Sequence, residues 1–394
     1  MAAEPKSAAR RAIINPAILK WARESSLLDI EAAAKYAHVS DPQKFAAAEK
    51  GDGYISFRQL EAFAHSCRLP LRVFYQKSPP KELRLPVDFR SDAEGHGHFT
   101  TELVKVLRSA RERQLAAVDL LAELEVERPP LPKASSDKEI LEVLTPLVCA
   151  KAWSNEIFRA TADSNSTKAL TYTKSLLEER LPLLIFEFPG ELSHVRGCSL
   201  YDEKLSVILL SSVDSPNARR FTLVHELVHL LLRQSGLCSP ISGLLSEEIE
   251  RRCNLLAGGA LMPQTFVKEV VSQAGSDIDR QVETVASRFR VSHSAAAVRL
   301  SQLDEISASD LRKRLDFYSK QWAKKREKQS EGDGGPNFHL LQVQRLGGTF
   351  TNAVLTGMER DLISLTQGAD LLGVAPSFKS FDGIREKLLT GQGG

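Results

Sequence analysis

The sequence has no long apolar run, few cysteines and no excess of charge of either sign. No stretch approaches the roughly 18 uncharged apolar residues of a membrane-spanning helix, so we expect no membrane span. The amino-terminal residues reach Arg10 and Arg11 without a long apolar segment, which argues against a secretory signal peptide. The five cysteines are scattered and never form a CxxC pair, so we expect neither a disulfide framework nor a thiolate zinc finger. These absences favour a cytoplasmic protein.

The charge balance restricts the kind of partner. Lys and Arg number 52 and Asp and Glu 50, which gives a formal net charge of +2. Such a balance excludes a uniformly basic nucleic-acid coat and an acidic tail, although a local basic patch stays open. A hydrophobic fraction of 42% is ordinary for globular domains, and 394 residues correspond to two or three domains at roughly 100–200 residues each.

The order of predicted elements gives a mostly α, α+β fold. Residues 13–78 read as short helices, with Asp29 and Ser56 as caps and Gly51 as a stop, and predict a helix-turn-helix bundle. Changes of composition then mark a linker and connecting helix, a central domain, a charged linker helix and a helical C-terminal domain, at 79–136, 137–304, 305–335 and 336–394. Within the central domain we expect strands at 183–188, 195–200 and 205–210.

One short segment, residues 221–232, indicates chemistry. It contains His225-Glu226-x-x-His229, and residues four apart share a face of a helix. His225 and His229 can therefore present two imidazoles to one metal ion, and zinc is the usual choice for such a pair with a carboxylate. Glu226 flanks the same opening, where it can take a proton from the zinc-activated water and give it to a leaving amine.

The remainder of this helix is apolar, so it belongs inside a core. Two histidines and a glutamate in such a helix need partners, and a metal site supplies them. A chance motif with hydrogen-bonded histidines is the less favoured interpretation.

A zinc ion held by two histidines and a water lacks one protein ligand. Glu247 and Glu250 both lie on a second expected helix, over residues 244–261, and the residues alone do not decide between them. The other candidates are His194, Asp214, Cys238, Glu248 and Cys253.

Two stretches, residues 219–232 and 249–263, resemble the ImmA/IrrE family of zinc metallo-endopeptidases. The resemblance implies a zincin-like domain with a small sheet, and it implies that Glu250 is the third zinc ligand. Val228 departs from the family, which usually has Gly there. Residues 15–75 look like the XRE-type helix-turn-helix that is often fused to these peptidases.

The resemblance also implies a substrate and a setting. The family is expected to cleave repressor or antitoxin proteins, often of XRE type, in stress responses, mobile elements and toxin–antitoxin modules. The segment 41–50, where a recognition helix is expected, is rich in alanine, so protein docking competes with DNA binding there. The alternative function is a DNA-binding regulator or toxin–antitoxin component with a structural or sensory metal site.

Two further features carry weaker expectations. Arg219 and Arg220 precede the motif and read as a solvated pair at a helix start, with oxyanion or carboxylate binding as the alternative. The strand at 205–210 is expected to pair internally, with pairing to a substrate peptide as the alternative.

Overall fold

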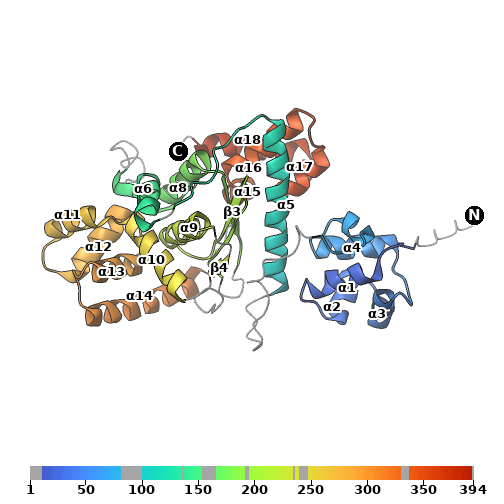
Figure 1. The fold of residues 1–394 in the computed structure, drawn as a ribbon, viewed down its shortest axis with the longest axis horizontal. Coiled ribbons are helices and arrows are strands. Elements are labelled where there is room, and N and C mark those ends of the chain that lie inside the picture. Colours follow the sequence, from blue (N-terminus) through green and yellow to red (C-terminus); the bar gives the residue numbers. More distant parts are fainter. Residues whose placement is uncertain are drawn as a thin grey trace, which may run out of the picture. The chain divides into compact units, whose positions relative to one another are not determined.

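The computed structural model describes residues 11–80, 100–134, 136–152, 166–190, 195–233, 236–238, 247–329 and 337–392. The described chain is mostly helical with one small sheet, which confirms the predicted fold class (Figure 1). It divides into two compact units, Met1–Arg113 and Gln114–Gly394.

The first unit is a bundle of short helices: α1 (Pro16–Glu24), α2 (Ile30–Tyr36), α3 (Pro42–Lys50), α4 (Phe57–Ser66) and the 3-10 helix η1 (Leu71–Tyr75). Asp29 and Ser56 cap α2 and α4 as expected, because each side chain accepts a hydrogen bond from a backbone N–H of the first turn. Three buried phenylalanines, Phe45, Phe63 and Phe74, pack edge to face at the centre.

Helix α3 occupies the place of the expected recognition helix. The exposed polar side chains of α3 are those of Gln43, Lys44 and Lys50. Glu49 is not among them, since it forms an ion pair with Arg23 of α1 at 2.8 Å. The surface of α3 therefore offers few groups that read base edges.

The second unit contains a four-stranded sheet of order β1-β3-β2-β4. Strands β1 (Leu183–Phe188) and β3 (Ser206–Ser211) are parallel, whereas β2 (Gly197–Leu200) runs antiparallel to both β3 and β4 (Gly236–Cys238). The three predicted strands are confirmed, and β4 was not predicted. Strand β3 lies between β1 and β2, as the internal-pairing expectation requires, so it offers no free edge to a substrate.

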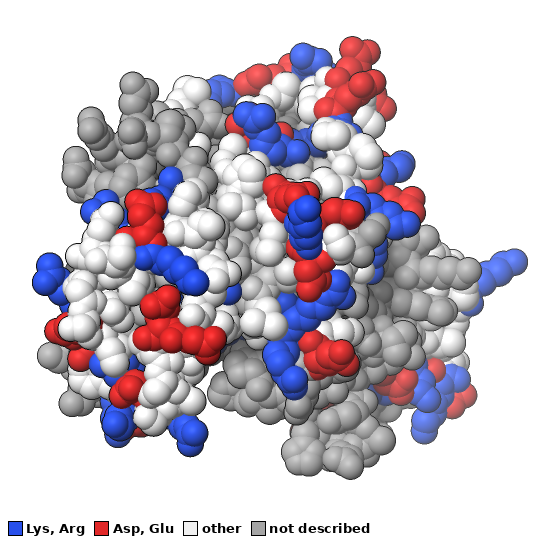
Figure 2. Space-filling view, turned by 60° about the vertical axis from the view of Figure 1, so that its left-hand side comes forward, with Lys and Arg blue, Asp and Glu red and all other residues white. Residues whose placement is uncertain are grey.

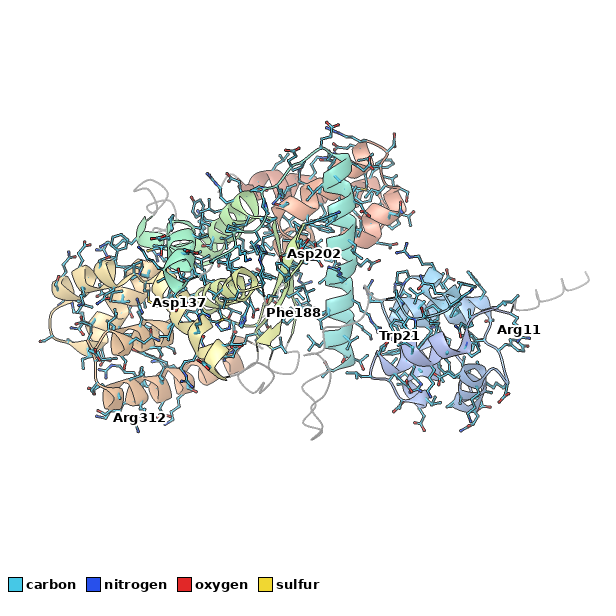
Figure 3. The ribbon with its side chains drawn as sticks, in the orientation of Figure 1. Arg11, Trp21, Asp137, Phe188, Asp202 and Arg312 are labelled. Atoms are coloured by element: carbon cyan, nitrogen blue, oxygen red, sulfur yellow. The ribbon has the colours of Figure 1, made fainter. Side chains whose placement is uncertain are left out.

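Among the helices of this unit, α8 (Ser166–Arg180) and α9 (Pro216–Leu231) pack against the sheet. The others on this side are α6 (Asp137–Val148), α10 (Glu247–Leu261), α11 (Gln264–Ala274), α12 (Ile278–Phe289), α13 (His293–Gln302) and α14 (Ala308–Gln329). Figure 3 marks Asp137 at the start of α6, Phe188 at the end of β1 and Asp202 in the turn after β2. Helix α14 packs on this group, because Arg314 pairs with Asp279 at 2.9 Å and Tyr318 stacks on His293.

Four C-terminal helices pack beside β1: α15 (Phe338–Leu346), α16 (Gly348–Glu359), α17 (Leu365–Leu372) and α18 (Phe378–Gln392). Phe350 of α16 meets Phe186 of β1 edge to face, with ring centroids 5.4 Å apart. Buried Glu178 of α8 accepts hydrogen bonds from the backbone of Ile185 and Thr349, and so links the sheet to the start of α16.

No helix within the described ranges combines the length and apolar character needed to cross a membrane. Figure 2 shows acidic and basic side chains intermixed on the face drawn, in keeping with the formal net charge of +2.

Arg220 is fully buried, so the expectation of a solvated arginine pair is wrong for this residue. Its guanidinium donates to Thr173 Oγ1 of α8 at 2.9 Å and to the carbonyls of Phe289 and Arg290 at 2.8 and 2.9 Å. It also donates to the carbonyl of Val148 at the end of α6. Arg220 therefore joins α9 to three neighbouring helices and does not face a substrate.

We expect Arg220→Met to lower the free energy of unfolding by about 3–5 kcal/mol, because it leaves several buried carbonyls without donors. The matched control is Arg180→Met, whose side chain is 62% exposed, and we expect a change within about 0.5 kcal/mol. Urea unfolding measures both variants. Equal stability of the two variants would contradict the structural role of Arg220.

Candidate metal centre and active site

Helix α9 carries the His-Glu-x-x-His motif into the core. Ser215 caps its first turn, and Pro216 occupies a first-turn position where a missing N–H costs nothing. From Leu223 to Leu231 every residue is buried, including His225, Glu226 and His229. The sequence pattern predicts this helix. Because the other side chains of α9 are apolar, the helix lies in the core and its polar residues are buried with it.

Helix α10 supplies the third side chain of the cluster. The Nε2 atoms of His225 and His229 lie 3.2 and 3.3 Å from the two carboxylate oxygens of Glu250 and 3.1 Å from each other. Glu250 keeps 22% of its side chain exposed, so the cluster opens to solvent on the α10 side. Among the described residues, these three are the group of His, Cys, Asp or Glu side chains that could hold a metal ion.

Two of the other candidates for the third ligand, Glu248 and Asp214, do not belong to this group. Glu248 is exposed, and Asp214 lies 3.8 Å from Arg196 in an ion pair. His194 falls outside the described residues, and the side chains of Cys238 and Glu247 are not described.

Cys253 is buried, as expected for a core thiol, but it also touches the cluster. Its Sγ lies 3.6 Å from Nδ1 of His229. This contact sits on the ring nitrogen that faces away from Glu250, so it helps to orient the imidazole with Nε2 toward the other two side chains.

The electrostatics of the cluster follow from its burial and its contacts. Burial lowers the pKa of His229, but hydrogen bonds with Cys253 and Glu250 outweigh it and raise that pKa to about 10. Burial raises the pKa of Glu250, yet hydrogen bonds from His225 and His229 bring it down to about 2. The cluster thus favours a positive charge beside the carboxylate of Glu250. A metal cation would supply this charge in place of the histidine proton.

The three side chains suit zinc in type and spacing. A tetrahedral zinc with bonds of about 2.0–2.2 Å would separate neighbouring ligand atoms by about 3.3–3.6 Å. The observed separations of 3.1–3.3 Å between the Nε2 and carboxylate oxygen atoms need only a small expansion to meet that value. Two imidazoles and one carboxylate, open on one side, form a donor set typical of catalytic zinc sites.

Gly197, at the start of β2, positions Glu226 and was missed by sequence reasoning. A Cβ at this glycine would lie 2.5 Å from Thr222 Cγ2 and 2.7 Å from Glu226 Oε1. Since no side chain fits there, the glycine allows α9 to lie directly against β2 with Glu226 beside the strand. An isolated glycine in a predicted strand signals such a close approach but does not identify the partner.

Comparison with known proteins identifies relatives of the region that contains this site. A family model, the IrrE N-terminal-like domain of the M78 peptidases, matches residues 178–301. This part of the chain belongs to that family. The IrrE-like domain, as we call residues 178–301, contains His225, Glu226, His229 and Glu250. The helices α1–α4, α5 (Thr101–Glu123), α6, α14 and α15–α18 lie outside the match.

Two relatives share this region. The chain is 34% identical over 108 residues to the radiation response metalloprotease IrrE of Deinococcus radiodurans, which covers 26% of this chain and 33% of that protein. It is 33% identical over 108 residues to the IrrE of Deinococcus deserti, with 26% of this chain and 38% of that protein covered. The chain thus spans little more than a third of the length of the curated relatives it matches.

We expect one zinc ion per chain in the IrrE-like domain, and we expect His229→Ala or Glu250→Ala to reduce that content to near zero, because each removes one of three ligands. The matched control on the same helix is Glu248→Gln, whose exposed side chain should leave the zinc content unchanged. Atomic emission or mass spectrometry of dialysed protein measures the content. Full zinc occupancy in Glu250→Ala would contradict the assignment of the third ligand.

Proposed function

We propose that the chain is a zinc-dependent endopeptidase in which His225, His229 and Glu250 hold zinc and Glu226 is the general base and acid. The observation that carries the proposal is the convergence of the three ligand atoms at 3.1–3.3 Å on a buried helix pair, with Glu226 fully buried beside them. When bound, zinc would act as a Lewis acid on the scissile carbonyl and would make hydroxide accessible near neutral pH.

The side chains of the protein divide the remaining work. Glu226 follows His225 directly in α9. We propose that its carboxylate reaches the opening between the two histidines. There it can accept a proton from the attacking water and deliver it to the leaving amine nitrogen. Gly197 keeps this carboxylate close to β2, and Cys253 keeps the imidazole of His229 oriented.

The proposed substrate is a regulatory protein, in particular an XRE-type repressor or antitoxin. The resemblance of the motif regions to the ImmA/IrrE peptidases supports this substrate class, and the relatives are named as radiation response metalloproteases. We further propose that the N-terminal helices α1–α4 recruit the substrate or its operator. The few polar side chains exposed on α3 favour recruitment through protein contacts over base readout.

Glu226→Gln should lower the rate of cleavage by a factor of about 10²–10⁴, because it removes the group that transfers the proton and leaves the three ligands in place. The measurement is cleavage of an XRE-type repressor encoded beside this gene, with zinc content recorded in parallel. Retained zinc with unchanged cleavage would rule out the role of Glu226. Loss of cleavage with retained zinc would contradict the alternative of a regulator with a purely structural or sensory metal.

Gly197→Ala tests the positioning of Glu226. The added methyl group must displace Thr222 or Glu226, and a shift of about 1 Å in a catalytic group can cost about 10²-fold in rate. We expect kcat to fall by about 10–100-fold at unchanged zinc content. Loss of zinc, or an unchanged kcat, would show that Gly197 does not act through Glu226.

A further inference from the structure

A pocket of about 370 Å³ lies between the two helices that carry the metal ligands. Helix α9 contributes Phe221 and Thr222, one turn before His225 and Glu226, and α10 contributes Asn254 and Gly258, beyond Glu250. The remaining lining comes from Ala218, from Arg196 just before β2, and from Ser292, Ser294, Ala295, Val298, Arg299 and Gln302 at or in α13. We call this cavity the arginine pocket.

The arginine pocket lies one turn along α9 from the candidate active site. Thr222 lines the pocket, and Thr222 and Glu226 both lie against the same point of β2, where a Cβ at Gly197 would meet them at 2.5 and 2.7 Å. A polypeptide lying with its scissile bond beside Glu226 would therefore place a neighbouring side chain at the pocket.

The pocket is positively charged. Its lining contains two arginines, Arg196 and Arg299, and no Asp or Glu among the described residues. Arg299 donates to the carbonyl of Met262 at 3.0 Å and to Gln302 Oε1 at 3.3 Å, both of them neutral acceptors. The lining also includes the start of α13, and the partial positive charge of a helix N-terminus adds to that of the guanidinium groups.

Arg299 is half-buried, and this burial lowers the pKa of its guanidinium. No described carboxylate forms an ion pair with it. Arg196, which is more exposed, has a single described ion pair, with Asp214 at 3.8 Å. An anionic group that entered the pocket would therefore pair with Arg299, for which the described residues supply no carboxylate.

The rest of the lining shows what kind of anion fits. Phe221, Ala218, Ala295 and Val298 form an apolar wall, and Asn254, Ser292 and Ser294 offer hydrogen-bonding groups. An apolar wall with cationic groups suits the methylene groups and the carboxylate of an acidic side chain.

We propose that the arginine pocket binds an aspartate or glutamate side chain of the substrate polypeptide close to the cleaved bond. This selectivity rests on the proposed peptidase function. A substrate would reach the pocket because the pocket lies close to Glu226, the proposed general base. The proposal thereby names a substrate class, polypeptides with an acidic residue beside the scissile bond.

Two variants test the pocket without touching the ligands or Glu226. Arg299→Gln removes the charge, and Gln can still donate a hydrogen bond toward the Met262 carbonyl. Gly258→Leu fills the space, since a Cβ there meets only side-chain atoms, of Gln302 and Arg299, at 3.8 and 4.0 Å. The matched control is Arg312→Gln, at an exposed arginine of α14 that Figure 3 labels.

The experiment measures cleavage of a random library of peptides with amidated C-termini by the zinc-loaded full chain. We expect wild type and Arg312→Gln to favour Asp or Glu about tenfold at one position near the scissile bond, the size typical of a charge-assisted hydrogen bond. Arg299→Gln should lose most of this preference while it still cleaves other peptides. Gly258→Leu should reduce cleavage of all long side chains at that position.

A binding arm separates this proposal from the proposed function. Amidated heptapeptides are selected on immobilised Glu226→Gln protein, with and without the second change Arg299→Gln. Acid-rich peptides selected in the absence of any wild-type cleavage would support the pocket and overturn the peptidase function. Cleavage without an acidic preference, or one that Arg299→Gln leaves intact, would overturn the pocket and leave the peptidase function standing. Because every peptide is amidated, a chain-end carboxylate cannot be the source of an acidic preference in either arm.

Discussion

The rest of the IrrE-like domain depends on one constraint, the burial of polar side chains on an apolar helix. Helix α9 is buried from Leu223 to Leu231, and the desolvation of two imidazoles and a carboxylate must be compensated inside the core. The neighbours of α9 provide this compensation. Glu250 of α10 faces the two histidines and Cys253 contacts His229, whereas the absence of a side chain at Gly197 only leaves room for Glu226 beside β2.

The same helix is held in place by a second set of buried polar contacts, one turn and more before the motif. Arg220 binds carbonyl groups at the ends of α6 and α12, and Arg219 pairs with Glu187 of β1 at 2.7 Å. Glu187 in turn pairs with Lys174, which donates to the carbonyl of Gln344 in α15. The register of α9 is thereby tied to the sheet and to the C-terminal helices, which lie outside the part matched by the family.

Acidic and basic groups lie at different places around α9. On the α10 side lie Glu250, the proposed third ligand, and the opening to solvent, whereas the arginine pocket lies further along, between α9, α10 and α13. A cationic pocket beside a site that can hold a divalent cation adds positive charge, and an acidic substrate would be drawn to both. Selectivity for protein substrates can thus arise from a local field, although the formal net charge of the chain is only +2.

Elements with a local signal could be predicted from the sequence. The four-residue spacing of His225 and His229, the caps of the short N-terminal helices and the apolar strands at 183–188 and 205–210 each depend on neighbours along the chain, and the structure has them. Contacts between groups from distant segments became visible in the folded chain. It brought Glu250 to the histidines, placed Gly197 against Glu226, buried Arg220 and assembled the arginine pocket from three helices and a strand end. The physical reason is that side-chain packing between elements, and not the periodicity within one element, selects these partners.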